Sequence, residues 1–216
     1  MRVKVPLPPY LPDALPSEKM LSIAQNVLPA VGGYRPARSF ISVSEALPGE
    51  FRGGASFISS DGTTHLLAGT PETLEKLSDG EWNELLNSLT GVGRWRFAQF
   101  GDYAVCVNGG ETQEVDLLAG TASALTNAPT GTSIAVVGDF VVIGQPDGDL
   151  LKVAWSAFND HTSWTLGVDQ AGDQPMLTGG EVMGLAGGEY GIILQRSRIV
   201  RMTRTGDPLE PFQFDE

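Results

Sequence analysis

Residues 94–108 read RWRFAQFGDYAVCVN, two apolar runs joined at Gly101-Asp102. The pattern returns at residues 134–143, IAVVGDFVVI, and at residues 187–194, GGEYGIIL, where Glu replaces Asp. A fainter copy is the SDG turn at residues 60–62, which HLLA follows at residues 65–68. Apolar runs on both sides of a Gly-Asp turn are typical of a β-hairpin. The sequence therefore predicts four copies of one unit that begins with a hairpin.

Each copy of the unit carries two landmarks. The first is a turn acid, and successive turn acids are separated by 41, 37 and 50 residues. The second is a large apolar residue 21 to 25 positions later, which we expect to open the last strand of the unit. A repeat of roughly 40 residues with several strands is the signature of a β-propeller blade, which buries its faces by stacking on other blades. In chain order the turn acids are Asp61, Asp102, Asp139 and Glu189, and the closing residues are Trp82, Leu125, Trp164 and Phe212.

The predicted fold class is all-β, with a β-propeller-like repeat of four blade-like units and an extended N-terminal arm. Four units are also compatible with a partial propeller. Residues 1–38 contain seven prolines, and proline has no amide hydrogen and fixes its own φ, so this part reads as an arm. The remaining residues 39–216 form the propeller-like domain, with units near residues 39–90, 91–130, 131–170 and 171–216. The alternatives are a β-sandwich or a propeller completed by other chain segments.

Local patterns refine this division. Short β-branched or aromatic runs predict strands at residues 40–43, 55–58 and 65–70. Residues 72–77 and 84–89 are expected to form short helical turns, and residues 17–27 one or two more. No long amphipathic period occurs, which agrees with a mainly β protein.

The composition limits the function. Gly and Pro together make up 41 of the 216 residues, above the roughly 12% of average proteins, which favours short strands and tight turns. The net charge is −12 and the sequence pI is about 4.5. An acidic surface argues against a general nucleic-acid binder and against binding to anionic membranes. It is compatible with a channel that DNA slides through, because like charge repels the phosphates.

Sequence motifs for chemistry are lacking. The acids between positions 139 and 173 are interpreted as turn residues; Asp147-Gly148-Asp149 hints at calcium, but no distal bidentate Glu follows. His65 and His161 have no partner at metal-ligand spacing, and no GxSxG occurs. Cys106 is the only cysteine and is expected to be a buried apolar residue. We therefore predict no catalytic residue, no cofactor and no metal, and expect a protein that is not an enzyme.

Two groups of arginines stand out against the acidic background. Period-two alternation places the first pair on one strand face. These arginines are either a solvated face that pairs with acids of the next unit, or contacts with an acidic partner surface or a pore lining. The candidate assembly contacts are Arg94 and Arg96, followed by Arg196, Arg198, Arg201 and Arg204.

Several segments together resemble a known family. They are RWRFAQFGDYAVCVNG at 94–109, VVGDFVV at 136–142, VAWSAFNDHTSW at 153–164 and the stretch at 179–216 that begins with GGEVMG and ends in FQFDE. The early segment AQNVLPAVGGYRPARSF at 24–40 also fits the family's N-terminal pattern. The sequences of these segments resemble virion proteins of tailed bacteriophages. The proteins in question are the propeller-bearing tail hub or nozzle proteins, which are related in pattern to the packaged-DNA stabilisation proteins of short-tailed phages.

The resemblance covers roughly residues 20–216 and implies a structural role. It implies a virion protein in the phage tail or at the head–tail connection, assembled in the host cytoplasm as a homo-oligomer, a ring of six copies around the DNA channel. The implied partners are other copies of the chain and neighbouring tail or head–tail adaptor proteins, with transient passage of double-stranded DNA during ejection and no membrane insertion. Proteins of this family usually continue past FQFDE into further strands, so the resemblance implies either a short or split version or a ring in which neighbours replace blades.

Two alternative functions stay open. The first is a tail-tip propeller that binds a receptor or a glycan, for which exposed aromatics such as Tyr103, Phe158 or Trp155 would have to cluster at one blade end. The second is a propeller hydrolase, which needs two or three carboxylates that converge in one pocket.

Overall fold

The N-terminal part of the chain contains a hairpin. The structure, a computed structural model, describes residues 23, 25–30, 33–37, 41–91 and 93–215. Internal contacts divide the chain into residues 1–43 and residues 44–216. In the first unit, β1 (Val27–Ala30) pairs antiparallel with β2 (Gly33–Pro36). Pro29 and Pro36 are tolerated because both strands of a two-stranded sheet are edges. The helical turns expected over residues 17–27 lie mostly outside the described residues, and Val27 begins a strand.

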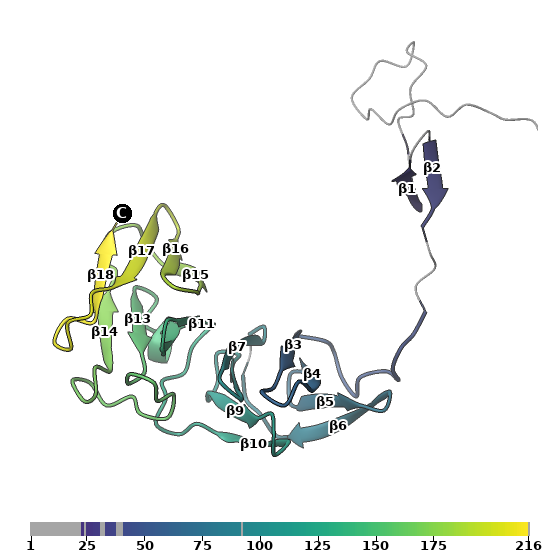
Figure 1. Cartoon of the computed structure of the whole chain (residues 1–216), viewed down its shortest axis with the longest axis horizontal. Helices are drawn as coiled ribbons and strands as arrows, with labels where there is room; N and C mark the ends of the chain where they lie inside the picture. Colours follow the sequence, from purple (N-terminus) through teal and green to yellow (C-terminus); the bar gives the residue numbers. More distant parts are fainter. Residues whose placement is uncertain (1–22, 24, 31–32, 38–40, 92, 216) are drawn as a thin grey trace, which may run out of the picture. The chain divides into compact units, whose positions relative to one another are not determined.

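Residues 44–216 form four four-stranded antiparallel sheets, each a meander in chain order (Figure 1). The fold is all-β and is built from propeller-like blades, as the repeat predicts. We number the sheets blade 1 to blade 4. Blade 1 contains β3 (Gly53–Ile58), β4 (Thr64–Gly69), β5 (Leu74–Ser78) and β6 (Glu81–Leu86); blade 2 contains β7 (Arg96–Phe100), β8 (Tyr103–Val107), β9 (Gln113–Asp116) and β10 (Thr121–Ala124); blade 3 contains β11 (Ser133–Val137), β12 (Phe140–Gly144), β13 (Lys152–Trp155) and β14 (Gly172–Pro175); blade 4 contains β15 (Val182–Ala186), β16 (Gly191–Gln195), β17 (Ile199–Arg204) and β18 (Phe212–Asp215).

The turn acids mark the blades correctly. Each of them lies between the first and second strand of its blade. In blades 2 and 3 the glycine before the acid has a φ of 58° and 56°, a left-handed conformation that glycine adopts without steric cost. The Gly-Asp pair therefore recurs in these two blades because the turn needs a left-handed residue at the glycine.

The closing residues identify the last strand in two of the four blades. Trp82 lies in β6, and Phe212 opens β18. For blades 2 and 3 the prediction was wrong, because Leu125 follows β10 and Trp164 lies in the loop before β14. Both side chains are nevertheless buried in the core between these two blades. Their size and apolarity signalled burial rather than a strand.

Other local predictions were also wrong. The helical turns expected at residues 72–77 and 84–89 are strands, because Leu74 pairs with Leu86 and both face the core between blades 1 and 2. Of the strand predicted at residues 40–43, residue 40 lies outside the described residues; residues 41–43 form no strand, and Ile41 and Val43 are exposed. The last strand of blade 3 extends past the expected unit boundary at residue 170, since it begins at Gly172. The break after the N-terminal part falls after residue 43 rather than after residue 38.

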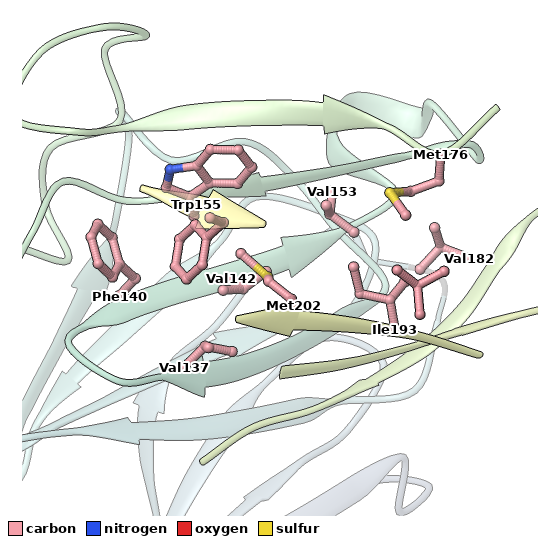
Figure 2. Close-up of a cluster of buried hydrophobic side chains, with 11 residues drawn as sticks. Val137, Phe140, Val142, Val153, Trp155, Met176, Val182, Ile193 and Met202 are labelled. Carbon is pink, nitrogen blue, oxygen red and sulfur yellow. The ribbon is translucent and has the colours of Figure 1, made fainter. Parts of the chain in front are cut away.

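Three apolar cores join successive blades. The core between blades 1 and 2 contains Trp95, whose indole donates a 2.8 Å hydrogen bond to the carbonyl of Thr70. The core between blades 3 and 4 contains Trp155, which lies edge-on to Phe212 with ring centres 5.2 Å apart. Figure 2 shows this core, with Trp155 and Phe140 at one end and Val153, Met176 and Val182 towards the other. Blades 2 and 3 thus bury one face against the blade before and the other against the blade after, whereas blades 1 and 4 each share one core with a neighbouring blade.

The hairpin turns also link neighbouring blades. Asp102 accepts hydrogen bonds from the amide and the hydroxyl of Ser60, at 2.6 and 2.7 Å, and so ties the turn of blade 2 to the turn of blade 1. Between blades 3 and 4, Gly188 exchanges backbone hydrogen bonds with Val136 and Gly138. These polar links hold the ends of the blades that the apolar cores do not reach.

Candidate assembly surfaces

Within the part of the chain that the structure describes, blades 1 and 4 each have a sheet face that no other blade covers. We call the face of a blade that turns towards the next blade in the chain its leading face, and the opposite face its trailing face. Strand alternation assigns Leu67 and Leu74 of blade 1 to the leading face, because they lie in the core shared with blade 2. It assigns Val200 and Met202 of blade 4 to the trailing face, in the core shared with blade 3. The trailing face of blade 1 and the leading face of blade 4 are therefore the two faces that pack against no other described blade.

The leading face of blade 4 is mostly apolar, and on it Arg201 stands opposite Asp215 across β17 and β18. Leu194 pairs with Ile199 and Ile192 pairs with Arg201 across β16 and β17. Ile199 is 63% exposed and Met183 on β15 is 61% exposed, values far above those of a packed sheet face. The Arg201 guanidinium lies 4.3 Å from the centre of the Tyr190 ring. Burying such a face would remove apolar area from water, which stabilises an assembly.

The trailing face of blade 1 is apolar beside a group of carboxylates. Leu66, Leu77 and Trp82 are successive cross-strand partners on this face. Ile58 on β3 is 62% exposed. The next row contains Glu75 opposite Glu84. Like charges directly opposite each other destabilise an antiparallel pair. A cationic partner here would therefore reduce the repulsion between the two glutamates.

The predicted arginines do not form one cluster. Arg204 is bound within the chain: its guanidinium lies 3.1 Å from a carboxylate oxygen of Asp139 in blade 3 and 4.4 Å from the ring centre of Phe158. Arg196 pairs with Glu181 at 2.7 Å within blade 4. These two fit the interpretation as solvated, internally paired side chains.

The other predicted arginines are exposed to solvent. Arg198 donates to the hydroxyl of Thr178 at 3.2 Å, and Arg201 has no carboxylate within ion-pair distance among the residues that the structure describes. Arg94 and Arg96 are exposed on either side of the buried Trp95, as the alternation predicts. Of the six arginines, Arg201 alone stands in the middle of an uncovered sheet face.

A third arginine joins the pair at the start of blade 2. The amide of Trp95 donates to the carbonyl of Arg52 at 3.0 Å, which brings residues 42 or more positions apart to one hollow of about 380 Å³. Arg52 also pairs with Glu50 at 2.9 Å. This grouping could not be predicted from the sequence, because only the pairing of consecutive blades brings Arg52 next to Arg94 and Arg96.

Several of the acids predicted as turn residues have that role, but the prediction was wrong for Asp173, which lies in β14. Asp160 accepts hydrogen bonds from the amide and hydroxyl of Thr162, and these bonds lower the pKa of its carboxyl. Asp149 accepts from the amide of Leu151, and Asp147 from the amide of Thr130. Within the described ranges, no group of three or more His, Cys, Asp or Glu side chains is arranged to hold a metal ion. The same residues include no helix long and apolar enough to cross a membrane.

One Ser–His–Asp grouping occurs in the turn of blade 1. The Ser59 hydroxyl lies 2.6 Å from a carboxylate oxygen of Asp61 and 2.9 Å from Nε2 of His65. An ionised carboxylate only accepts, so the single hydroxyl proton goes to Asp61 and the imidazole donates to the serine oxygen. A nucleophilic serine needs the opposite direction, with histidine as acceptor and the carboxylate on the histidine. The hydrogen bond from Ser59 is the main cause that lowers the pKa of Asp61, and burial is the main cause that lowers the pKa of His65.

The aromatics expected of a receptor-binding tip do not all lie at the surface. Tyr103 and Phe158 are partly exposed, whereas Trp155 is buried in the core between blades 3 and 4. A hollow of about 530 Å³ lies elsewhere, between the loop at residues 126–129 and blade 3. Lys152 lines it and pairs there with Asp173 at 3.0 Å, and this hydrogen bond raises the pKa of the ammonium group.

Comparisons with known proteins do not identify a family for this chain. No protein-family model matches the chain, and no curated protein matches it. Among solved structures, one match is a chain from an S. cerevisiae complex of a Dbp5 variant with Nup159, a Gle1 variant, IP6 and ADP. It is 11% identical, covers 74% of this chain and 46% of the matched chain, and has a TM-score of 0.42. This chain thus spans less than half of that one, and a likeness at this level carries no argument about function.

Proposed function

We propose that this chain is a structural virion protein of a tailed bacteriophage. It would form part of the tail, as nozzle or hub, or the head–tail junction, as a ring of copies around the DNA channel. The observation that carries the proposal is the pair of largely apolar sheet faces on blades 1 and 4 that no other blade of the described residues covers. A protein that leaves Ile58, Met183 and Ile199 in water gains stability when neighbouring subunits cover them.

Two sequence features support the same role. The segments that resemble tail hub and nozzle proteins span most of the described blades, and the resemblance implies six copies. The net charge of −12 suits a wall past which DNA moves without binding. In this proposal the protein has no catalytic step, is assembled in the host cytoplasm and reaches its final location in the virion.

The proposal is tested by following the protein into particles. Virions purified through a density gradient from the host that carries this gene are analysed by quantitative mass spectrometry. A fixed copy number per particle, retained after nuclease and high-salt washes, supports a structural role. Loss of the protein in the washes, with infectious particles left intact, would contradict it.

A glycan-binding propeller is the second candidate, and the hollow beside Lys152 and Asp173 favours it. Carboxylates and an ammonium group around a hollow of about 530 Å³ offer the polar contacts that a sugar needs. Binding of the purified protein to a glycan array, abolished by Asp173→Ala, would support this candidate. An array without any bound glycan would remove it.

A further inference from the structure

We propose that a pocket on the trailing face of blade 1 binds the Arg201 side chain of a second copy of this chain. Copies would then join head to tail, with blade 4 of one on blade 1 of the next. This inference rests on the proposed assembly function and names the contact between copies. It follows from one unsatisfied buried group, one uncovered arginine and the way in which blades pack inside the chain.

The pocket is acidic and aromatic. It has a volume of about 400 Å³, and the described residues that line it include four glutamates and a tryptophan but no cationic side chain. Carboxylates and a tryptophan face are the groups that an arginine guanidinium prefers, through charge-assisted hydrogen bonds and cation–π contact. The lining groups that matter here are Glu45, Glu75, Glu81, Trp82 and Glu84.

One carboxylate oxygen of Glu75 lacks a hydrogen-bond donor in the described part of the pocket. The residue is only 1% exposed, although it is a carboxylate among three other glutamates. Its Oε1 has no hydrogen-bond partner among the described residues. A buried polar atom without a partner costs free energy, and an N–H donor that enters the pocket would remove that cost.

The opposite surface supplies the donor. Arg201 lies on the leading face of blade 4, between its cross-strand partners Ile192 and Asp215. The same face carries the exposed Leu194, Ile199 and Met183. These side chains would meet Leu66 and the other apolar residues on the trailing face of blade 1. The two surfaces are therefore complementary in two ways: apolar area faces apolar area, and a cation faces carboxylates.

The packing inside the chain provides the template for this contact. Trp155 pairs with Val142 in blade 3 as Arg201 pairs with Ile192 in blade 4, so Arg201 occupies the position of Trp155. Trp155 packs on Phe212 in the fourth strand of the following blade. In blade 1 the aromatic of the fourth strand on the trailing face is Trp82, next to Glu84.

The contact is heterologous, because the two surfaces differ. Repetition of a head-to-tail contact closes a ring when the rotation between copies allows it. Such a ring is the arrangement that the proposed function requires. The inference concerns only how copies touch, and it can fail while the protein is still a virion component.

The test measures the oligomeric state of the purified full chain by analytical ultracentrifugation. We expect self-association of the wild type, and we expect Arg201→Glu or Glu84→Arg each to weaken it by about thirtyfold or more, because a charge at the contact is reversed. The double variant Arg201→Glu/Glu84→Arg should recover most of the loss. Glu210→Arg, the same charge change on an exposed loop, is the matched control and should associate like the wild type.

A second measurement identifies the two faces directly. A chain that carries both Arg201→Cys and Glu84→Cys should form intermolecular disulfides on mild oxidation, whereas either single variant should not. Cys106 does not compete because it is fully buried. A wild type that stays monomeric, oligomers that resist both charge reversals, or single-cysteine variants that cross-link equally well would each overturn the proposal. In the first case a different protein partner would have to cover these faces.

These results are separable from the test of the proposed function. Stable copy number in virions together with monomeric purified protein would sink the pocket contact alone. Self-association through Arg201 without any protein in virions would sink the virion role and leave the contact standing.

Discussion

Asp102 holds Ser60 through two hydrogen bonds, from the amide at 2.6 Å and from the hydroxyl at 2.7 Å, across 42 positions of sequence. A turn acid that repeats in every unit thus serves, in blade 2, to tie its blade to the one before it. The ionised carboxylate makes both bonds charge-assisted, which strengthens them relative to neutral pairs.

The Asp102→Ala variant should lose this link. We expect the free energy of unfolding to fall by about 1–2 kcal/mol, because both donors of Ser60 must find water instead. Hydrogen exchange at the amide of Ser60, followed by NMR, should become faster. Asp102→Asn keeps one acceptor oxygen, so its free energy of unfolding should lie between those of the wild type and Asp102→Ala. Unchanged exchange in Asp102→Ala would show that the link does not stabilise the turn.

Glycine at position 187 should be required where blades 3 and 4 meet. A Cβ there would overlap the carbonyl oxygen of Val136, next to the backbone bonds of Gly188. We expect Gly187→Ala to lower the free energy of unfolding by about 2 kcal/mol or more, since the backbone must shift. The control is Gly184→Ala in the same blade, where the nearest heavy atom, of Leu194, is 3.9 Å from the added Cβ. Equal melting temperatures for the two variants would contradict this account.

His65 should make the fold sensitive to acid. Burial lowers its pKa in the folded protein, Lys76 lowers it further, and Asp61 opposes the shift. In the window below the usual histidine value of 6.5, the unfolded chain binds a proton that the folded chain does not, so stability should fall as the pH falls. The variant His65→Gln should flatten the pH dependence of the melting temperature in this window. The lowered pKa of Asp61 acts only below its usual 3.8, so the two groups can be told apart. A wild-type profile that stays level between pH 6.5 and 5 would refute the prediction.

Cys106 should report on opening between blades 1 and 2. Its side chain is fully buried in their shared core, and burial raises the pKa of the thiol. Only the thiolate reacts readily, so the folded protein should resist a thiol reagent at neutral pH. Denaturant that unfolds blade 2 should expose one reactive thiol per chain. Rapid labelling of the native protein would mean that this core opens on the time scale of the assay.

Arg204 and Arg201 should behave differently although both belong to β17. Arg204→Gln removes the pair with Asp139 and the contact with Phe158, and should lower stability by about 1 kcal/mol without affecting self-association. Arg201→Gln breaks no ion pair in the isolated chain, so its melting temperature should stay close to that of the wild type. Parallel thermal denaturation and ultracentrifugation of the two variants check this. Loss of self-association in Arg204→Gln alone would reverse the roles that we assign.

The sequence predicted the blades because their hairpins are local. The Gly-Asp turns at positions 101–102 and 138–139 need a left-handed glycine, and that requirement is visible in the chain. The closing residues were harder to interpret, since Leu125 and Trp164 are buried by a neighbouring blade without lying in a strand. Short strands such as β5 were mistaken for helical turns, because their pairing partner and their core come from outside the segment.

The candidate surfaces could be predicted only in part. The arginines were visible as a cluster in sequence, but the distinction between Arg204 and Arg201 depends on which face of blade 4 each one reaches. Glu75 could not be singled out at all, because its burial depends on the segment at residues 45–48 and on β6. Such features arise from contacts between elements, which a single sequence does not display.

Electron cryo-microscopy of the purified particle tests the central claim most directly, with the chain carrying an internal tag at the exposed loop near Asp207. The account predicts a ring of copies on the axis of the tail or at the head–tail junction, surrounding the path of the DNA, with blade 4 of each copy on blade 1 of the next. Density for the tag only at the periphery of the tail tip, or particles that lack the protein, would contradict it.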